Sequence, residues 1–308
     1  MRKITDMTRR IKSFFSNDIW TLDHEELSAA KARYIKYTKV MLITIRTFSS
    51  QKIGFQAVAL SFFSTMSVVP FIAIAIAVTD GFGVTDKLTE IMYSYFYNSQ
   101  DIINTIIGFA QNIIITAQSS AMGLFSAMLF VWIVIWMMLS VERVFNNVWK
   151  VQISRNLLKR LMVIIAMLIL SPFIIIVFFA GSVVYSHMLA YFGLNVEEFT
   201  VFKTILSWVT FAALAMLTFS AMYKFIPNAD VRYKEALRAA IPAAIAFSVM
   251  QYMYLETQVF VTRINAIYGA FAAVPLFMIW LNVGWFIILF GSELSYAFQH
   301  VDSYNIED

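Results

Sequence analysis

An uncharged stretch near the end of the chain constrains the fold more than any other feature. Residues 264–292 contain no charged side chain, and Glu293 follows them directly. A hydrocarbon layer about 30 Å thick needs about 20 apolar helical residues to cross it. The stretch is therefore long enough to predict a membrane-spanning helix that ends in a carboxylate.

Composition extends this conclusion to the whole chain. Of the 308 residues, 60% are hydrophobic and only 14% are charged, and the mean hydropathy is +0.72. Soluble domains are about half apolar and about a quarter charged. The chain contains no cysteine, which excludes disulfides, thiolate metal sites and cysteine nucleophiles. We therefore expect an all-α polytopic membrane protein.

Charge-free stretches set the expected number of crossings at six. The predicted spans are 56–79, 121–143, 161–185, 204–223, 237–256 and 270–293. Residues 85–118 carry apolar faces interrupted by polar side chains, which predicts amphipathic helices resting on the outer interface. The spans form one transmembrane domain over 56–298, and a short cytoplasmic tail follows over 299–308.

The first 55 residues form a basic amphipathic region. A capping box of Asp23 and Glu26 predicts the start of a helix. Its apolar residues recur every three or four positions: Leu27, Ala30, Tyr34, Tyr37, Met41, Ile45 and Phe48. No signal-peptide core follows the first basic residues, so no cleavage is expected. We interpret the region as a surface that faces lipid headgroups.

The distribution of cations predicts the orientation. Of the 23 lysines and arginines, 20 lie before the first span, between the second and third, or between the fourth and fifth. By the positive-inside rule these segments face the cytoplasm. Both termini are thus expected in the cytoplasm of a bacterial inner-membrane protein, and the basic pI requires no nucleic-acid partner.

Four sequence blocks, at residues 59–71, 141–149, 223–228 and 268–294, carry a resemblance to a known family. They run Ala-Leu-Ser-Phe-Phe to Ser-Val-Val-Pro-Phe, Val-Glu-Arg-Val-Phe-Asn-Asn-Val-Trp, Tyr-Lys-Phe-Ile-Pro-Asn, and Tyr-Gly through to Gly-Ser-Glu-Leu. In order and spacing they resemble the YihY/virulence factor BrkB family of bacterial membrane proteins. The resemblance implies a six-span inner-membrane fold and a role in transport or export, and the family also carries an old ribonuclease label.

The residues themselves weigh against ribonuclease activity. The histidines, His24, His187 and His300, lie on separate segments, whereas metal-dependent hydrolysis needs clustered ligands. Nucleotide-binding and nucleophile-elbow glycine patterns are absent. We expect no enzymatic activity, no catalytic residue, no metal and no cofactor, so transport would depend on a gradient or a partner.

Polar residues at membrane depth are the candidate site residues, because each is costly to insert. Two carboxylates, Glu142 and Glu293, lie at the cytoplasmic ends of spans, and Arg143 and Lys224 are the cations expected beside them. Asn282 lies deeper in the sixth span. Three residues mark the outer mouth: Glu256, Arg263 and Tyr268. Two interpretations stay open: a gate, proton or substrate site, or interfacial charges that neutralise each other.

Prolines and small residues add predictions about shape. Pro70, Pro172 and Pro275 fall within the first, third and sixth spans, where the kinks either line a cavity or simply shape the bundle. A small-residue stripe on the fifth span predicts a packing face inside the bundle. Its residues are Ala236, Ala240, Ala244 and Ser248.

Two functions remain open from the sequence. The first is a transporter or exporter of an amphipathic or lipid-like molecule. The second is a non-transporting scaffold that organises the envelope. Membrane lipids are the expected partners; nucleic acid is not, a homo-oligomer stays open, and no protein partner is identified.

Overall fold

A computed structural model describes residues 19–21, 28–86, 89–90, 93, 104–105, 107–108, 111–113, 115–116, 120–152, 155–156, 158–166, 168–170, 173, 200–264 and 269–304. Its named helices are α2 (Ile19–Thr21), α3 (Ala29–Ser50), α4 (Ile53–Gly81), α7 (Ala121–Val148), α9 (Thr200–Phe225), α10 (Tyr233–Ile264) and α11 (Gly269–His300). These residues contain no strand, so the all-α prediction is confirmed for them.

Five helices are long and apolar enough to cross a membrane. They are Ile53–Gly81, Ala121–Val148, Thr204–Phe225, Tyr233–Thr257 and Val274–His300. Each overlaps a predicted span, since a helix pairs all its backbone groups internally and an apolar run has no other stable form in lipid. The predicted third span, 161–185, and the interfacial helices over 85–118 lie mostly outside the described residues.

The outer faces of these helices are apolar as well as exposed. On α7, for example, Phe125, Trp132 and Trp136 are each at least half exposed. A soluble protein rarely leaves apolar surface of this extent open to water. We therefore assign these faces to lipid, in agreement with the composition.

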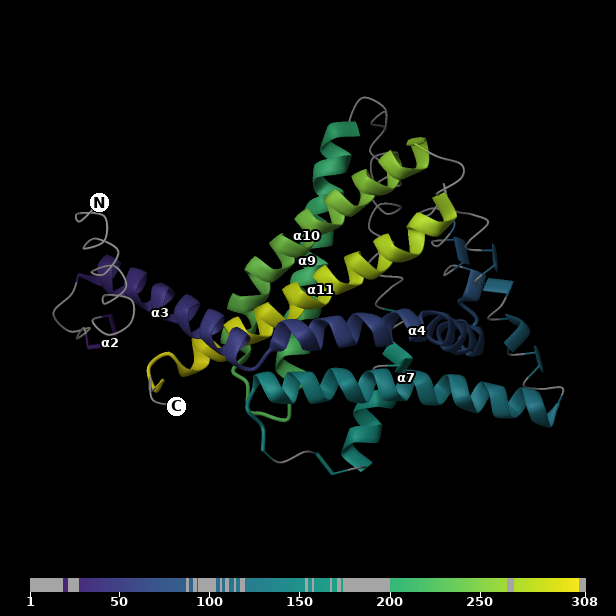
Figure 1. Ribbon diagram of the computed structural model, residues 1–308, viewed down its shortest axis with the longest axis horizontal. Coiled ribbons are helices and arrows are strands. Elements are labelled where there is room, and N and C mark those ends of the chain that lie inside the picture. Colours follow the sequence, from purple (N-terminus) through teal and green to yellow (C-terminus); the bar gives the residue numbers. More distant parts are fainter. Residues whose placement is uncertain are drawn as a thin grey trace.

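Helix α11 occupies the centre of the bundle. It packs against α3, α4, α7, α9 and α10, with the pair α9 and α10 on one side and the pair α4 and α7 on the other. The two pairs diverge along the length of α11 (Figure 1). Helix α11, which contains most of the uncharged stretch 264–292, is thus the element that the other long helices contact.

The small-residue stripe of α10 is a packing face, as predicted. Ala236 and Ala240 are fully buried and Ala244 is 2% exposed, where α10 meets α9 and α11. The opposite face of α10 exposes Ile241 and Ile245. Among the described helices, α10 packs mainly against α9 and α11, whereas α11 also contacts α3, α4 and α7.

The cation-rich segments gather at one end of the molecule. Lys36 of α3 pairs with Asp302 after α11 at 2.8 Å. Arg155, after α7, donates to the carbonyl of Phe225 at 2.9 Å. The backbone N–H of Arg232, before α10, donates to the side-chain oxygen of Gln299 at 2.8 Å. The segments that the sequence placed on one side of the membrane therefore do lie together.

Helix α3 differs from its predicted start and face. Ser28 precedes the helix without a side-chain cap, and the proposed capping box lies outside the described residues. Most of the predicted apolar stripe turns away from the bundle, since Tyr34 is 75% and Ile45 is 55% exposed. Its last member, Phe48, packs against two phenylalanine rings of α11. The buried face instead carries Lys39, Val40, Ile43, Thr44 and Thr47.

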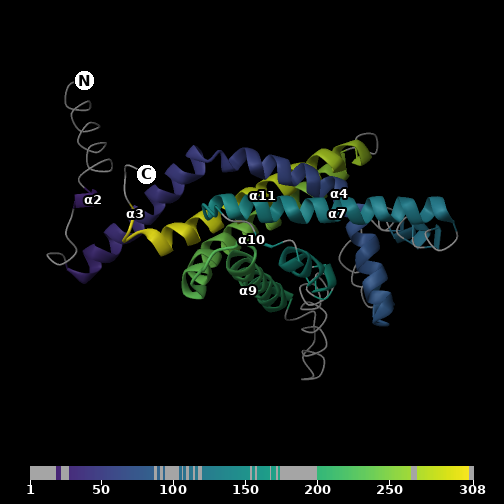
Figure 2. The ribbon, with the colours of Figure 1, turned by 90° about the horizontal axis from the view of Figure 1, so that it is seen from below.

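Prolines occur inside three of the long helices. Pro70 lies buried within α4, Pro275 lies within α11, and Pro242 lies within α10, where the sequence analysis had not noted it. Pro172 falls outside the described residues. Figure 2 shows α4 changing direction sharply along its length, and proline is the common cause of such kinks.

Candidate functional site

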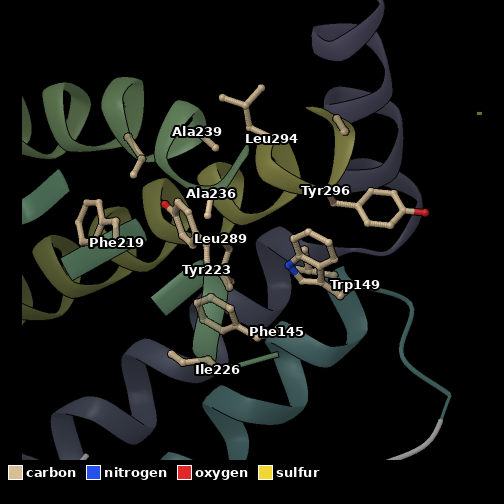
Figure 3. Close-up of a cluster of buried hydrophobic side chains, with 14 of the residues drawn as sticks. Phe145, Trp149, Phe219, Tyr223, Ile226, Ala236, Ala239, Leu289, Leu294 and Tyr296 are labelled. Carbon is tan, nitrogen blue, oxygen red and sulfur yellow. The ribbon is translucent and has the colours of Figure 1, made fainter. Parts of the chain in front are cut away.

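Three of the blocks singled out in the sequence meet at the cation-rich end. Phe145 of α7 and Tyr223 of α9 have ring centroids 6.4 Å apart, and Trp149 and Tyr296 have centroids 5.6 Å apart (Figure 3). We use the name helix junction for this end of α7, α9 and α11, with Phe145, Tyr223 and Gly291 in contact and the buried carboxylates of Glu142 and Glu293 on the same helices. On α11, Glu293 points about 200° away from Gly291, towards Thr47 of α3.

Glu293 is the most unusual member of the junction. It is fully buried on α11, and neither carboxylate oxygen has a hydrogen-bond partner among the described residues. Thr47 of α3 and Lys150 after α7 are its polar neighbours, but the Thr47 hydroxyl donates to the carbonyl of Ile43. A buried carboxylate without donors is costly in its charged form.

Tyr223 fills the centre of the junction. Its side chain is fully buried and its hydroxyl has no hydrogen-bond partner among the described residues. It lies against Gly291 so closely that a Cβ at that glycine would be 2.1 Å from the hydroxyl oxygen and 2.9 Å from the Cβ of Ala243. The glycine is therefore required for α9 and α11 to approach at this level.

Glu142 is paired, but with a residue that the sequence analysis did not select. Arg160 donates from Nε to one oxygen of Glu142 at 2.7 Å, and the other oxygen has no partner among the described residues. Arg143, the expected partner, is exposed. Successive helical residues point about 100° apart, so the cation next in sequence cannot share the buried face of Glu142.

Lys224, the other expected cation, serves the turn between α9 and α10 instead. It donates to the carbonyl of Val231 and lies 3.7 Å from Asp230. Arg155 holds the same turn through the carbonyls of Phe225 and Pro227, at 2.9 and 3.0 Å. The structure therefore gives Lys224 a structural contact and separates it from both carboxylates of the junction.

The deeper amide and the outer residues are only partly described. Asn282 is half-buried on α11, and its side chain makes no hydrogen bond with the described residues. Glu256 is exposed near the end of its span. The side chain of Arg263 and all of Tyr268 lie outside the described residues.

Polar links between spans come from residues that the sequence analysis did not select. Trp285 of α11 donates its indole N–H to the Ser64 hydroxyl of α4 at 2.8 Å, and Trp280 donates to Gln251 of α10 at the same distance. Indole N–H groups need acceptors when buried. The sequence signal that could have predicted these links is the presence of tryptophans on one span and of serine or glutamine on others.

The described residues offer no evident metal centre. Among them, no group of three or more His, Asp or Glu side chains is placed to hold an ion. A buried carboxyl group such as that of Glu293 is chemically able to bind a proton.

A family model described as Virulence factor BrkB matches residues 44–308, which include all of the junction. The chain belongs to the Virulence factor BrkB family. The resemblance read from the four blocks is confirmed, and this BrkB-family chain is a membrane protein with several apolar helices.

Curated relatives of the BrkB-family chain are described as UPF0761 membrane proteins. The relative from Janthinobacterium sp. (strain Marseille) is 26% identical over 82% of this chain and 58% of its own length. The relative from Aromatoleum aromaticum is 32% identical over 77% of this chain and 58% of its own length. The relative from Alteromonas mediterranea is 27% identical over 82% of this chain and 85% of its own length. The chain thus spans about three fifths of the length of the first two. No solved structure matches.

Proposed function

We propose that this chain is a non-enzymatic transporter or exporter in the bacterial inner membrane, with both termini cytoplasmic, and that its substrate is amphipathic or lipid-like. The observation that carries the proposal is the fully buried carboxylate of Glu293, which has no hydrogen-bond donor among the described residues. A purely structural bundle gains nothing from such a group, because its burial costs free energy without a compensating bond.

The position of Glu293 supports a coupling role. It lies on α11, the helix that contacts both helix pairs, so a change of charge there acts on both pairs at once. Binding a proton or a cationic group removes the cost of the buried charge and favours the packed arrangement. Releasing it favours an arrangement in which the carboxylate reaches water. The carboxyl group of Glu293 would thus switch the bundle between two arrangements, as gradient-driven transport requires.

A test measures transbilayer movement of a fluorescent phosphatidylglycerol in proteoliposomes under an imposed pH gradient. We expect movement that depends on the gradient in the wild type and falls at least about tenfold in Glu293→Gln, which removes the titration while preserving shape. Arg143→Gln is the control, since this neighbouring charge is exposed. Movement no faster than in protein-free vesicles would contradict lipid transport.

A second function, the scaffold, is favoured by the packing at Gly291. The contact with Tyr223 leaves no room even for a methyl group at this level, as in a rigid bundle. The same experiment separates the two: a scaffold gives no gradient-dependent movement, and Glu293→Gln then changes only stability.

A further inference from the structure

A groove outside the helix junction lies at the cation-rich end. It has a volume of about 380 Å³ and is bounded by the first half of α3, the start of α10 and the residues that end α11. Three cations line it, Arg33, Lys36 and Arg238, with Asp302 as the lining anion. The rings of Tyr37 and Phe298, whose centroids lie 5.8 Å apart edge to face, form its apolar wall.

The cations of the groove can accept a further anion. Arg33 forms no ion pair with the described residues. Arg238 binds Glu235 through Nη1 alone, at 2.9 and 3.1 Å, which leaves its other nitrogens without a protein acceptor among the described residues. Lys36 pairs with Asp302 at the surface, where the side chains are 42% and 71% exposed, and such exposed pairs contribute little. A phosphate has the acceptor oxygens to match these donors.

The surroundings of the groove favour a lipid over a free anion. Tyr37, Met41 and Ile45 are spaced four residues apart on α3, so they continue one exposed apolar face away from the groove. Cations beside exposed aromatic and aliphatic side chains are typical of the headgroup level of a membrane. Helix α3 also contains no acidic residue to repel an anionic headgroup.

We propose that this groove binds the phosphate headgroup of an anionic phospholipid, with an acyl chain lying along Tyr37, Met41 and Ile45. The lipid joins α3, α10 and the end of α11, and so stabilises the cation-rich end of the molecule. The proposal does not depend on transport, because binding at the groove involves none of the residues of the helix junction.

The test titrates the full-length protein in neutral detergent with dioctanoyl phosphatidylglycerol and counts bound lipids by native mass spectrometry. The double variant Arg33→Gln/Arg238→Gln removes one charge from α3 and one from α10 inside the groove. Lys31→Gln/Lys234→Gln removes the same charges from the same helices at exposed positions outside it. The single variant Arg33→Gln breaks no ion pair. It therefore tests the groove even if the double variant folds poorly because Glu235 has lost its partner Arg238.

We expect the affinity for the first lipid to fall about 30-fold in the groove variant, about fivefold in Arg33→Gln, and less than threefold in the outside variant. Dioctanoyl phosphatidylcholine, whose headgroup has no net charge, should bind at least tenfold more weakly. Equal losses in both double variants would overturn the site, since only diffuse attraction then operates. Displacement of the lipid by millimolar inorganic phosphate would overturn the lipid assignment.

Discussion

At the scale of single residues, two buried carboxylates and one close contact between a glycine and a tyrosine characterise the helix junction. Glu142 and Glu293 were selected because charge is costly at membrane depth, and both are buried. The partner of Glu142 could not be predicted, because Arg160 lies 18 residues away beyond a loop. Gly291 and Tyr223 were noted only as members of the sequence blocks. Their contact could not be predicted, because it depends on the distance between α9 and α11, which the sequence does not show.

The contact between Gly291 and Tyr223 gives a prediction about stability. Gly291→Ala should destabilise the bundle by about 3 kcal/mol or more, because the added Cβ overlaps a tyrosine that is buried on all sides. Gly284→Ala is the control on the same helix, where a Cβ would meet only Phe247 at 3.4 Å and Met250 at 3.8 Å. Equal effects in a denaturant titration would contradict the packing of the junction.

The ion pair between Glu142 and Arg160 gives a second prediction. Breaking a buried pair leaves one charge without its partner, so Glu142→Gln should cost about 2–3 kcal/mol. In a double-mutant cycle, Arg160→Gln should cost much less on the Glu142→Gln background than alone. Exposed Arg143→Gln should cost under about 0.5 kcal/mol. Additive effects in the unfolding free energy would show that the two side chains do not interact.

At the scale of elements, helix positions followed from the sequence more readily than helix faces. A run of apolar residues fixes where a span lies, because the backbone must pair within it. Which face meets protein does not follow, because lipid and protein interior are equally apolar. On α3 most of the expected stripe is exposed, and Lys39 and two threonines, Thr44 and Thr47, are buried.

The burial of Lys39 predicts a pH dependence of the packing of α3. Burial lowers the pKa of Lys39 from its ordinary value of 10.5, and the nearby Asp302 opposes this only in part. The unfolded state therefore holds the proton more strongly, so stability is reduced at neutral pH and recovers as the pH rises towards 10.5.

Lys39→Met should accordingly slow hydrogen exchange in α3 at pH 7, despite losing the contact of the ammonium with the Trp20 ring at 5.9 Å. The difference from wild type should shrink as the pH approaches 10.5. Lys31→Met, exposed on the same helix, should show no such difference. Faster exchange in Lys39→Met at pH 7 would mean that the ring contact outweighs the cost of burial.

At the scale of the whole molecule, the charge distribution predicted a feature that local patterns could not. Segments far apart in the sequence meet at one end, as Lys36 with Asp302 and Arg155 with the turn after α9 demonstrate. The number of crossings rested on uncharged runs, and five of the six predicted spans fall on described helices of sufficient length.

The absence of cysteine makes the topology directly testable. We expect Ser303→Cys, after α11, to react with a membrane-impermeant maleimide only in inverted vesicles. Asp86→Cys, after α4, should react in intact spheroplasts, because it lies past the opposite end of a span. Labelling of both from the same side would contradict the predicted orientation and the odd number of crossings between these positions.

The central position of α11 has a mechanical consequence. Since the helix contacts both pairs, the pairs cannot separate without one of them losing its interface with α11. An opening that preserves the interface of one pair must therefore carry α11 with that pair and break the interface with the other. A cross-link between α10 and α11 and one between α4 and α11 should consequently restrain the molecule unequally.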